Sequence, residues 1–224
     1  VSVAEHYDLL IDEGDDPVKD PPALRAYMER WDGAPFIEAL CPDKAAEILE
    51  IGVGTGRLAA RVAPLCGGFT GIDVSPKTIA RAAENLAGLQ NVTLICGDFL
   101  QFPFEKKFDA VYSSLTFLHI RAKCKAIQKV AKLLKDGGRF VLSVDKNAQK
   151  FLECGERRGR LYPDDPQKTE EHLRAAGFTV TENLKIGREI STPNLVSRVF
   201  GKAMEGLDVE AMAKDARKAL KTIG

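Results

Sequence analysis

The chain has 224 residues, 45% of them hydrophobic and 29% charged, which is the composition of an ordinary soluble globular protein with a substantial core. Lysine plus arginine equals aspartate plus glutamate, 32 against 32, so the formal net charge is zero. Because this balance leaves no electrostatic footprint for nucleic acid or for an anionic membrane surface, we expect neither as a partner.

Other features of the sequence argue against secretion and against metal binding. The five cysteines are widely spaced and include no C-x-x-C pair, so neither a disulfide framework nor a zinc site is expected. The start, VSVAEHYDLL, lacks a basic region followed by a long apolar run, and no segment approaches the ~20 apolar residues that span a bilayer. We expect a cytoplasmic protein with reduced thiols, no metal and no membrane span.

The first forty residues are predicted to be mainly helical. Residues 1–10 favour a short helix, and the acidic, proline-rich segment 12–22 reads as an exposed connection. Apolar residues follow helical spacing over 24–31, and Gly33 and Pro35 are expected to break that run.

From residue 44 onwards, predicted strands and helices alternate. The strands are expected at 45–51, 69–74, 92–96, 108–113 and 139–144, and the helices at 58–65, 76–86 and 121–134. Ser75 is a good N-cap for the second helix, and the glycines of Lys135-Asp136-Gly137-Gly138 end the third. Alternation at this pitch predicts an α/β protein with a doubly wound, mostly parallel sheet covered on both faces.

The remainder of the chain is less regular. We expect a polar, variable insertion at 146–166, a helix at 169–176, a sixth strand at 177–185 and a seventh at 195–200. Apolar residues of 210–223 share one helical face, which predicts a C-terminal helix docked on the core.

The strongest functional signal is the glycine-rich segment Glu50-Ile51-Gly52-Val53-Gly54-Thr55-Gly56-Arg57. Glycines allow positive φ and a close approach of the backbone to a ligand, and the helix that follows turns free N–H groups toward it. The G-x-G-x-G spacing differs from the G-x-G-x-x-G of dinucleotide folds, and no G-K-[ST] follows, which excludes a P-loop. Taken alone, the turn is also compatible with a strand–helix connection that binds nothing.

Two acidic residues follow the next two strands. Asp73, in GIDVS, can accept hydrogen bonds from both hydroxyls of a ribose, or it can cap the helix that starts near Pro76. Asp98, in CGDF, can accept a hydrogen bond from an adenine amino group, with Phe99 or its backbone beside the ring, although such a turn is often only structural.

Five segments in this order resemble the motifs of class I S-adenosylmethionine-dependent methyltransferases: EILEIGVGTGR, GIDVS, ICGDF, FDAVYSSLTFLHI and LLKDGGRFVLSV. They look most like the small-molecule branch related to quinone-biosynthesis methyltransferases. The resemblance runs from about residue 45 to about 144 and is weaker over 170–202. It implies S-adenosylmethionine as the cofactor, S-adenosylhomocysteine as its product, and a Rossmann-like sheet of seven strands in the order 3-2-1-4-5-7-6 with the seventh antiparallel.

The resemblance also implies roles for single residues. The loop that holds the methionine part of the cofactor would consist of Glu50, Gly52, Gly54, Thr55 and Gly56. The ribose and adenine would be contacted by Asp73, Val74, Asp98 and Phe99, and the sulfur would lie near Ser114 and Leu115.

The catalytic groups are less defined by the sequence. Methyl transfer needs the acceptor atom, the methyl group and the sulfur nearly in line, and it needs a base only where the acceptor must lose a proton. His119 is the first candidate base, and His6 and Tyr7, on a helix expected to fold over the cofactor, are the second candidates; His119 and Tyr7 can instead be structural.

Two clusters could form the acceptor side. Tyr27, Met28 and Trp31 either line an acceptor pocket or belong to a helical core stripe. The arginines of 157–160 either attract an acidic acceptor or form a solvated loop.

We therefore expect a single methyltransferase domain over 1–224, with an N-terminal helical lid (1–43), a cofactor-binding core (44–145), an acceptor-side insertion with the last strands (146–202) and a C-terminal helix (203–224). The predicted reaction is methyl transfer to a small-molecule acceptor by in-line displacement in a water-excluded pocket, by a monomer or homodimer. A protein methyltransferase and a non-catalytic cofactor-binding member of the fold are the alternatives. The glycine spacing disfavours a nicotinamide-dependent oxidoreductase, and the neutral charge disfavours an enzyme acting on nucleic acid.

Overall fold

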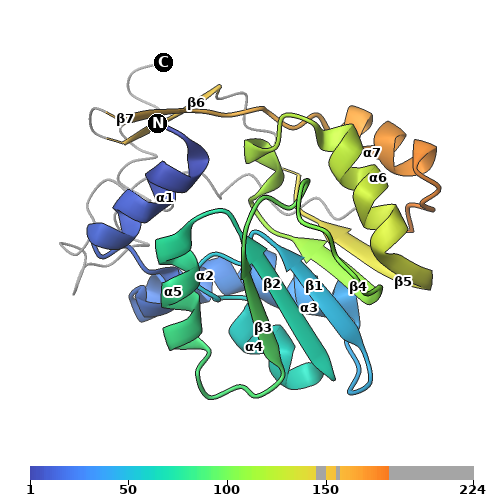
Figure 1. The fold of residues 1–224 in the computed structure, drawn as a ribbon, viewed down its shortest axis with the longest axis horizontal. Coiled ribbons are helices and arrows are strands. Elements are labelled where there is room, and N and C mark those ends of the chain that lie inside the picture. Colours follow the sequence, from blue (N-terminus) through green and yellow to red (C-terminus); the bar gives the residue numbers. More distant parts are fainter. Residues whose placement is uncertain (145–149, 155–156, 182–224) are drawn as a thin grey trace.

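A five-stranded parallel sheet forms the centre of the computed structural model, which describes residues 1–144, 150–154 and 157–181 (Figure 1). The strand order is β3-β2-β1-β4-β5, which confirms the predicted doubly wound α/β architecture. The strands are β1 (Glu47–Ile51), β2 (Gly68–Asp73), β3 (Val92–Cys96), β4 (Phe108–Ser113) and β5 (Leu134–Leu142). Because neighbouring strands are parallel, their carboxyl ends meet at one edge, where ligands bind in such sheets.

Each face of the sheet carries its own apolar core, since successive strand residues point to opposite faces. Ile48 belongs to the core under α3 (Ala34–Leu40), α4 (Ala59–Val62) and α5 (Pro76–Asn85). Its neighbour Leu49 belongs to the core on the other face, under α6 (Lys123–Leu133) and α7 (Pro166–Ala175). Strands buried on both faces explain the near-continuous apolar runs in the sequence.

The N-terminal helix α1 (Val3–Asp12) begins with a capping box. The side chains of Ser2 and Glu5 each accept a hydrogen bond from the backbone N–H of the other residue. The helix packs against α5, beside the sheet (Figure 1). Residues 12–22 after this helix are predicted to form an exposed connection. This prediction is wrong at Asp16, which is buried, and the connection contains a 3-10 turn, η1 (Pro17–Lys19).

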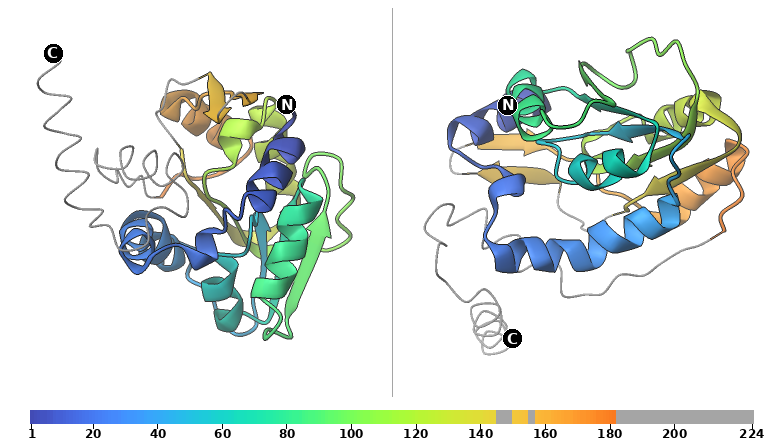
Figure 2. Two further views of the ribbon diagram at one scale, coloured as in Figure 1. Left: turned by 90° about the vertical axis from the view of Figure 1, so that its left-hand side faces the viewer. Right: turned by 90° about the horizontal axis from the view of Figure 1, so that it is seen from below.

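The predicted break at Gly33 and Pro35 is also wrong. A π-helical turn, η2 (Glu29–Gly33), joins α2 (Pro22–Met28) directly to α3, and the three elements run on as one helical stretch along the molecule (Figure 2). Pro35 lies in the first turn of α3, where a helix tolerates proline. The side chains of Tyr27 and Trp31, predicted on this stretch, lie outside the part that the structure describes.

The predicted insertion at 146–166 contains two short strands, β6 (Phe151–Cys154) and β7 (Arg157–Arg160). They form an antiparallel pair of their own, separate from the main sheet, and β7 packs against α1. Two further turns of 3-10 helix follow α4 and β4, namely η3 (Ala63–Leu65) and η4 (Phe117–His119).

Several predicted boundaries shift for physical reasons. β5 begins at Leu134 instead of Arg139, because Leu134 pairs with Phe108 before an irregular step in the register. α7 begins at Pro166 instead of Thr169, because the Asp165 carboxylate accepts hydrogen bonds from the first N–H groups of that helix.

The seven-strand order is not confirmed. Residues 177–181 are irregular, and the rest of the predicted sixth strand, the seventh strand (195–200) and the C-terminal helix (210–223) lie outside the described residues.

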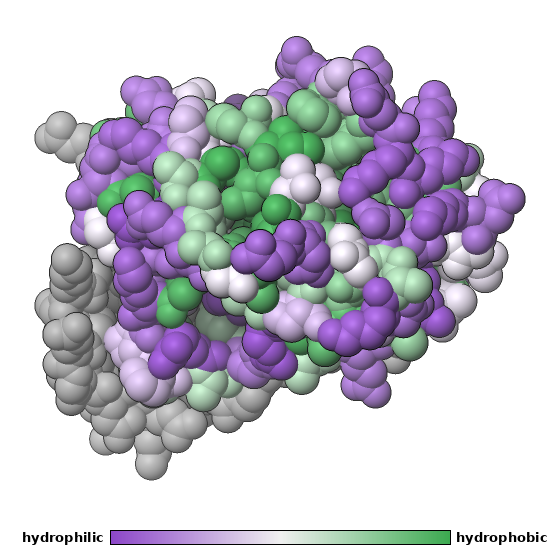
Figure 3. All heavy atoms as spheres, turned by 60° about the horizontal axis from the view of Figure 1, so that its bottom comes forward, coloured by the Kyte–Doolittle hydropathy of each residue, from purple (hydrophilic) through white to green (hydrophobic). Residues whose placement is uncertain are grey.

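Seen from below, hydrophilic side chains surround a more apolar area on the surface (Figure 3). Within the part of the chain that the structure describes, no helix is both long and apolar enough to cross a membrane.

Candidate active site

The glycine-rich turn leaves β1 at the carboxyl edge of the sheet and is fixed to β2. The N–H groups of Gly52 and Val53 both donate to the Ile72 carbonyl, at 2.8 and 3.1 Å. Gly52 has a φ of +78°, and a Cβ there would lie 2.0 Å from the Thr116 hydroxyl oxygen. Gly54 has a φ of +55°, yet a Cβ there would meet nothing within 4 Å. A side chain at Gly52 would therefore collide with the protein, whereas the space beside Gly54 is open.

Asp73 lies at the end of β2, beside the open part of this turn. One carboxylate oxygen accepts the Gly54 N–H at 3.1 Å, and the other accepts the Ser75 N–H at 3.1 Å. Burial raises the pKa of Asp73 despite these hydrogen bonds. Val74 follows it and is half-buried. The predicted N-cap role of Ser75 is confirmed, because its hydroxyl accepts the Thr78 N–H at 3.0 Å.

Glu50 is a buried acid at the base of the turn, with 3% of its surface exposed. Its carboxylate accepts a hydrogen bond from the Tyr112 hydroxyl at 2.7 Å, across the β1–β4 pair. Burial raises the pKa of Glu50 to about 8, and the negative charges of Asp32 and Asp73 act in the same direction. A cation placed beside Glu50 would favour its ionised form.

A buried ion pair that the sequence analysis missed joins the N-terminal segment to the turn. Arg57 donates two hydrogen bonds to Asp32, which is fully buried, and Ser114 donates to the same carboxylate at 3.1 Å. Burial alone would lower the pKa of Arg57, but its bonds to Asp32 raise it. The π-helical turn carries Asp32, and this turn interrupts the helical spacing that a sequence pattern can detect.

The segment after β4 touches both the turn and the N-terminal helices. Leu115 has a left-handed backbone, with a φ of +53°, and its N–H donates to the Ser143 hydroxyl at 2.7 Å. Its side chain packs against the buried Leu24 and Met28 of α2. A bulky residue in this conformation is strained, and such strain is concentrated at functional sites.

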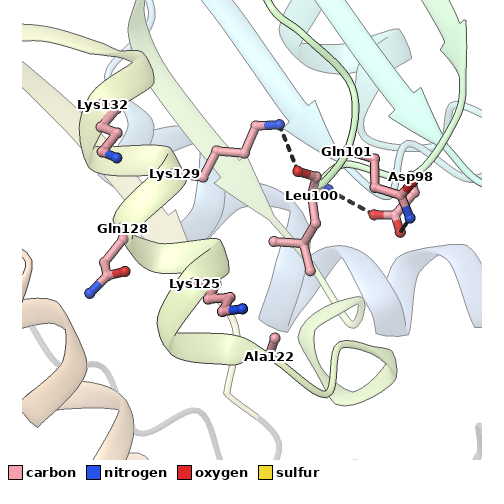
Figure 4. Close-up of a pocket in the computed structure, with 8 residues that line it drawn as sticks. All are labelled: Asp98, Leu100, Gln101, Ala122, Lys125, Gln128, Lys129 and Lys132. Carbon is pink, nitrogen blue, oxygen red and sulfur yellow. Dashed lines mark hydrogen bonds between the residues drawn. The ribbon is translucent and has the colours of Figure 1, made fainter.

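Asp98 and Phe99 follow β3 and point in different directions. The exposed Asp98 accepts hydrogen bonds from Leu100 N–H at 2.7 Å and from the Gln101 amide at 3.2 Å. The Phe99 ring is buried in the core under α6, so only its backbone could face a ligand. Asp98 also borders an open groove of about 750 Å³ whose other wall carries the lysines of α6 (Figure 4).

The two predicted catalytic residues lie in contact with each other. The Tyr7 hydroxyl of α1 is 2.9 Å from Nε2 of His119, at the end of η4. The segment after β7 is attached to the same place, because Tyr162 N–H donates to the Leu118 carbonyl at 2.8 Å. Three elements distant in sequence thus converge beside the carboxyl end of β4.

The arginines of β7 do not act as one cluster. Arg157 pairs with Glu13 of α1 at 2.8 Å, while Arg158 and Arg160 lie over the Phe151 ring with their side chains exposed.

Thr55 is buried in the glycine turn, and its carbonyl accepts the Asn85 amide at 2.9 Å. The structure therefore gathers Glu50, the glycines, Asp73, Ser114 and Leu115 at one edge, and Asp98 lies at the border of that edge.

Comparisons with known proteins agree with this arrangement. A family model described as a methyltransferase domain matches residues 48–138. An uncharacterized methyltransferase of Anoxybacillus flavithermus is 31% identical over 173 residues, which are 69% of this chain and 80% of that protein. The chain belongs to the methyltransferase family. A second relative of this methyltransferase, the demethylmenaquinone methyltransferase of Tropheryma whipplei, is 33% identical over 108 residues, 47% of this chain and 44% of that protein.

Solved structures share the fold of this methyltransferase. The [4+2]-cyclase SpnF is 26% identical with a TM-score of 0.63, covering 80% of this chain and 73% of that one. DhpI, solved as its complex with SAH, is 22% identical with a TM-score of 0.60, covering 78% and 85%. The five-stranded parallel sheet with its flanking helices is thus the Rossmann-like architecture of class I methyltransferases.

Proposed function

We propose that this methyltransferase moves the methyl group of S-adenosylmethionine to a small-molecule acceptor. In this proposal residues 1–43 form a lid, 44–145 bind the donor and 146–202 face the acceptor. The observation that carries the proposal is the contact between Asp73 and the Gly54 N–H, beside the open space over Gly54. An acid fixed at the end of β2 next to a bare stretch of backbone suits a ribose and the chain attached to it.

The residues at this edge fit the donor in charge as well as in shape. S-adenosylmethionine supplies, when bound, an electrophilic methyl group on a positively charged sulfur. Arg57 already pairs with Asp32, so the carboxyl groups that a cationic ligand would meet here are those of Glu50 and Asp73. Gly52, Thr55 and Gly56 complete the loop around the methionine part. Further along the donor, Val74, Asp98 and the backbone of Phe99 would lie at the adenine, and Ser114 and Leu115 at the sulfur.

The acceptor side carries the Tyr7–His119 pair. A hydroxyl 2.9 Å from an imidazole nitrogen can pass a proton between the two groups. We propose that the acceptor loses its proton to this pair as its bond to the methyl carbon forms and the carbon–sulfur bond breaks. Leu115 packs against Leu24 and Met28 of α2, and we propose that this apolar group helps to exclude water from the site.

Calorimetry with both sulfur compounds tests the donor site. Titrating S-adenosylmethionine and S-adenosylhomocysteine should give micromolar affinities, and Asp73→Ala should weaken both by roughly 100-fold through loss of a charged acceptor and its partners. A nicotinamide cofactor is the control and should give no heat. No heat with either sulfur compound would overturn the proposal, and unchanged affinity in Asp73→Ala would remove that residue from the site.

A labelled methyl donor identifies the acceptor class. Incubation with a metabolite extract and, separately, with a protein extract distinguishes a small-molecule acceptor from a protein acceptor. The similarity to a [4+2]-cyclase favours a second candidate, a donor-binding enzyme that transfers no methyl group. Tight binding without label in any fraction would support that second candidate.

A further inference from the structure

Asp8 connects α1 to the start of α5. Its Oδ1 atom accepts a hydrogen bond from the Ser75 hydroxyl at 2.7 Å and one from the Lys77 N–H at 3.0 Å. These partners are 67 and 69 residues away in the sequence. The contact is therefore tertiary, and α1 must lie on α5 for it to form.

The position of Asp8 suits the chemistry of a helix start. The first N–H groups of a helix have no partner within the helix, and the N-terminus favours negative charge. Ser75 bonds the Thr78 N–H and Asp8 bonds the Lys77 N–H, so two acceptors from different segments cap the same turn. Pro76, the remaining residue of that turn, has no N–H to bond.

A short path leads from Asp8 to the proposed ribose carboxylate. The Ser75 hydroxyl donates to Asp8, while the Ser75 N–H donates to Oδ1 of Asp73. The other oxygen of Asp73 holds the Gly54 N–H of the glycine turn. Fixing Ser75 from the side of α1 therefore fixes the direction of the Asp73 carboxylate.

We propose that Asp8 is a positioning residue for the methyl donor. It holds the turn 73–77 in the conformation that presents Asp73 to the ribose, so that tight donor binding requires α1 to be docked on α5. This inference rests on the proposed donor site at Asp73. It assigns to α1 an action on the ribose end of the site, distinct from that of Tyr7 at the acceptor end.

Asp12 supplies a matched control on the same helix. One turn beyond Asp8, it pairs with the Nζ atom of Lys77 at 2.6 and 2.7 Å, and both side chains are about half exposed, 49% and 50%. An exposed pair is screened by solvent and contributes little. Asp12→Ala therefore removes an α1–α5 contact made by the Lys77 side chain and leaves both hydrogen bonds of Asp8 in place.

Calorimetric titration with S-adenosylhomocysteine tests the inference on the whole chain. We expect Asp8→Ala to weaken binding roughly tenfold, which corresponds to the loss of hydrogen bonds to a charged acceptor, and Asp12→Ala to stay within about twofold of wild type. Adenosine, which carries the ribose without the methionine part, should be weakened by the same factor. Asp8→Asn keeps the acceptor oxygen but loses the charge, and should weaken binding about threefold.

The outcomes separate this inference from the proposed function. If wild type binds neither S-adenosylhomocysteine nor adenosine, the proposed function fails. If wild type binds and Asp8→Ala behaves like Asp12→Ala, the inference is overturned and the donor site stands. A lower melting temperature in Asp8→Ala with unchanged affinity also overturns it, because Asp8 would then be structural alone. Should Asp8→Ala not fold, an affinity of Asp8→Asn equal to that of Asp12→Ala decides against the inference.

Discussion

Arg57 and Asp32 are joined by two hydrogen bonds between a guanidinium and a carboxylate, one of them 2.8 Å long. Arg57 follows the glycine turn, and Asp32 lies on the π-helical turn of the N-terminal segment. The pair is more than a surface contact, because the Asp32 side chain is 0% exposed and that of Arg57 only 21%. The N-terminal segment is thus part of the wall of the candidate site.

Removing one partner of this pair should be costly. Asp32→Ala leaves the Arg57 cation buried without its carboxylate, and we expect the free energy of unfolding to fall by about 3 kcal/mol or more. Urea denaturation measures it. The control is Glu29→Ala, which breaks a pair with Arg61 whose side chains are 37% and 45% exposed and should cost about 1 kcal/mol or less. Equal losses in both variants would contradict the buried role of Asp32.

Glu50 should make stability fall as pH rises. Its pKa is about 8 in the folded protein, against an ordinary value of 4.5, mainly because it is buried. Between these values the folded state keeps a proton that the unfolded state has lost, so unfolding becomes easier from about pH 5 to about pH 8. Melting temperatures across this range should therefore fall in wild type and less steeply in Glu50→Gln. Parallel curves would mean that Glu50 is ionised when folded.

The two glycines of the turn should respond differently to alanine. Gly54→Ala puts a methyl group into open space and should cost only about 1–2 kcal/mol of backbone strain, while strongly weakening donor binding. Gly52→Ala should destabilise the fold itself, since the new Cβ would collide with Thr116. Melting curves and donor titrations of both variants check this contrast. Undiminished donor affinity in a folded Gly54→Ala protein would show that nothing binds there.

The Tyr7–His119 contact should matter for turnover more than for donor affinity. Once an acceptor is known, Tyr7→Phe should lower kcat by about 10²-fold if the acceptor carries a proton to be removed, with donor affinity nearly unchanged. His119→Ala should lower it to a similar extent, and the double variant should add little, because the two groups act as a unit. Tyr162→Phe is the control, because the nearby Tyr162 is attached to this segment through its backbone N–H. An equal loss in Tyr162→Phe would mean that the pair is structural.

The core of the fold was predictable because its signals are local. β3 and β4 have the predicted bounds, and Ser75 caps α5 as expected, since strands buried on both faces and capped helix starts leave short-range patterns. The glycine turn and the position of Asp73 beside it were predictable for the same reason. Their spacing follows from one strand, one turn and one helix.

The contacts between distant segments could not be predicted in this way. Asp32 meets Arg57 only because an extra residue in a π-helical turn rotates it inward, and no periodic pattern marks such a turn. Asp16 reads as part of a solvated acidic run, yet it is buried against Arg81 and Asn85. Phe99 lies in a segment predicted to contact the ligand, but its ring turns into the core. Tertiary packing decided each of these cases.

The N-terminal segment has a further consequence for the charge of the protein. Residues 1–43 contain eleven acidic and three basic side chains, although the whole chain is neutral. Asp12, Asp16 and Asp32 meet Lys77, Arg81 and Arg57 of the remaining chain. The chain is therefore neutral because the excess negative charge of residues 1–43 cancels the excess positive charge of residues 44–224. A protein shortened to begin at residue 44 would carry a strong positive charge, bind to cation exchangers that the full chain passes, and adhere to polyanions.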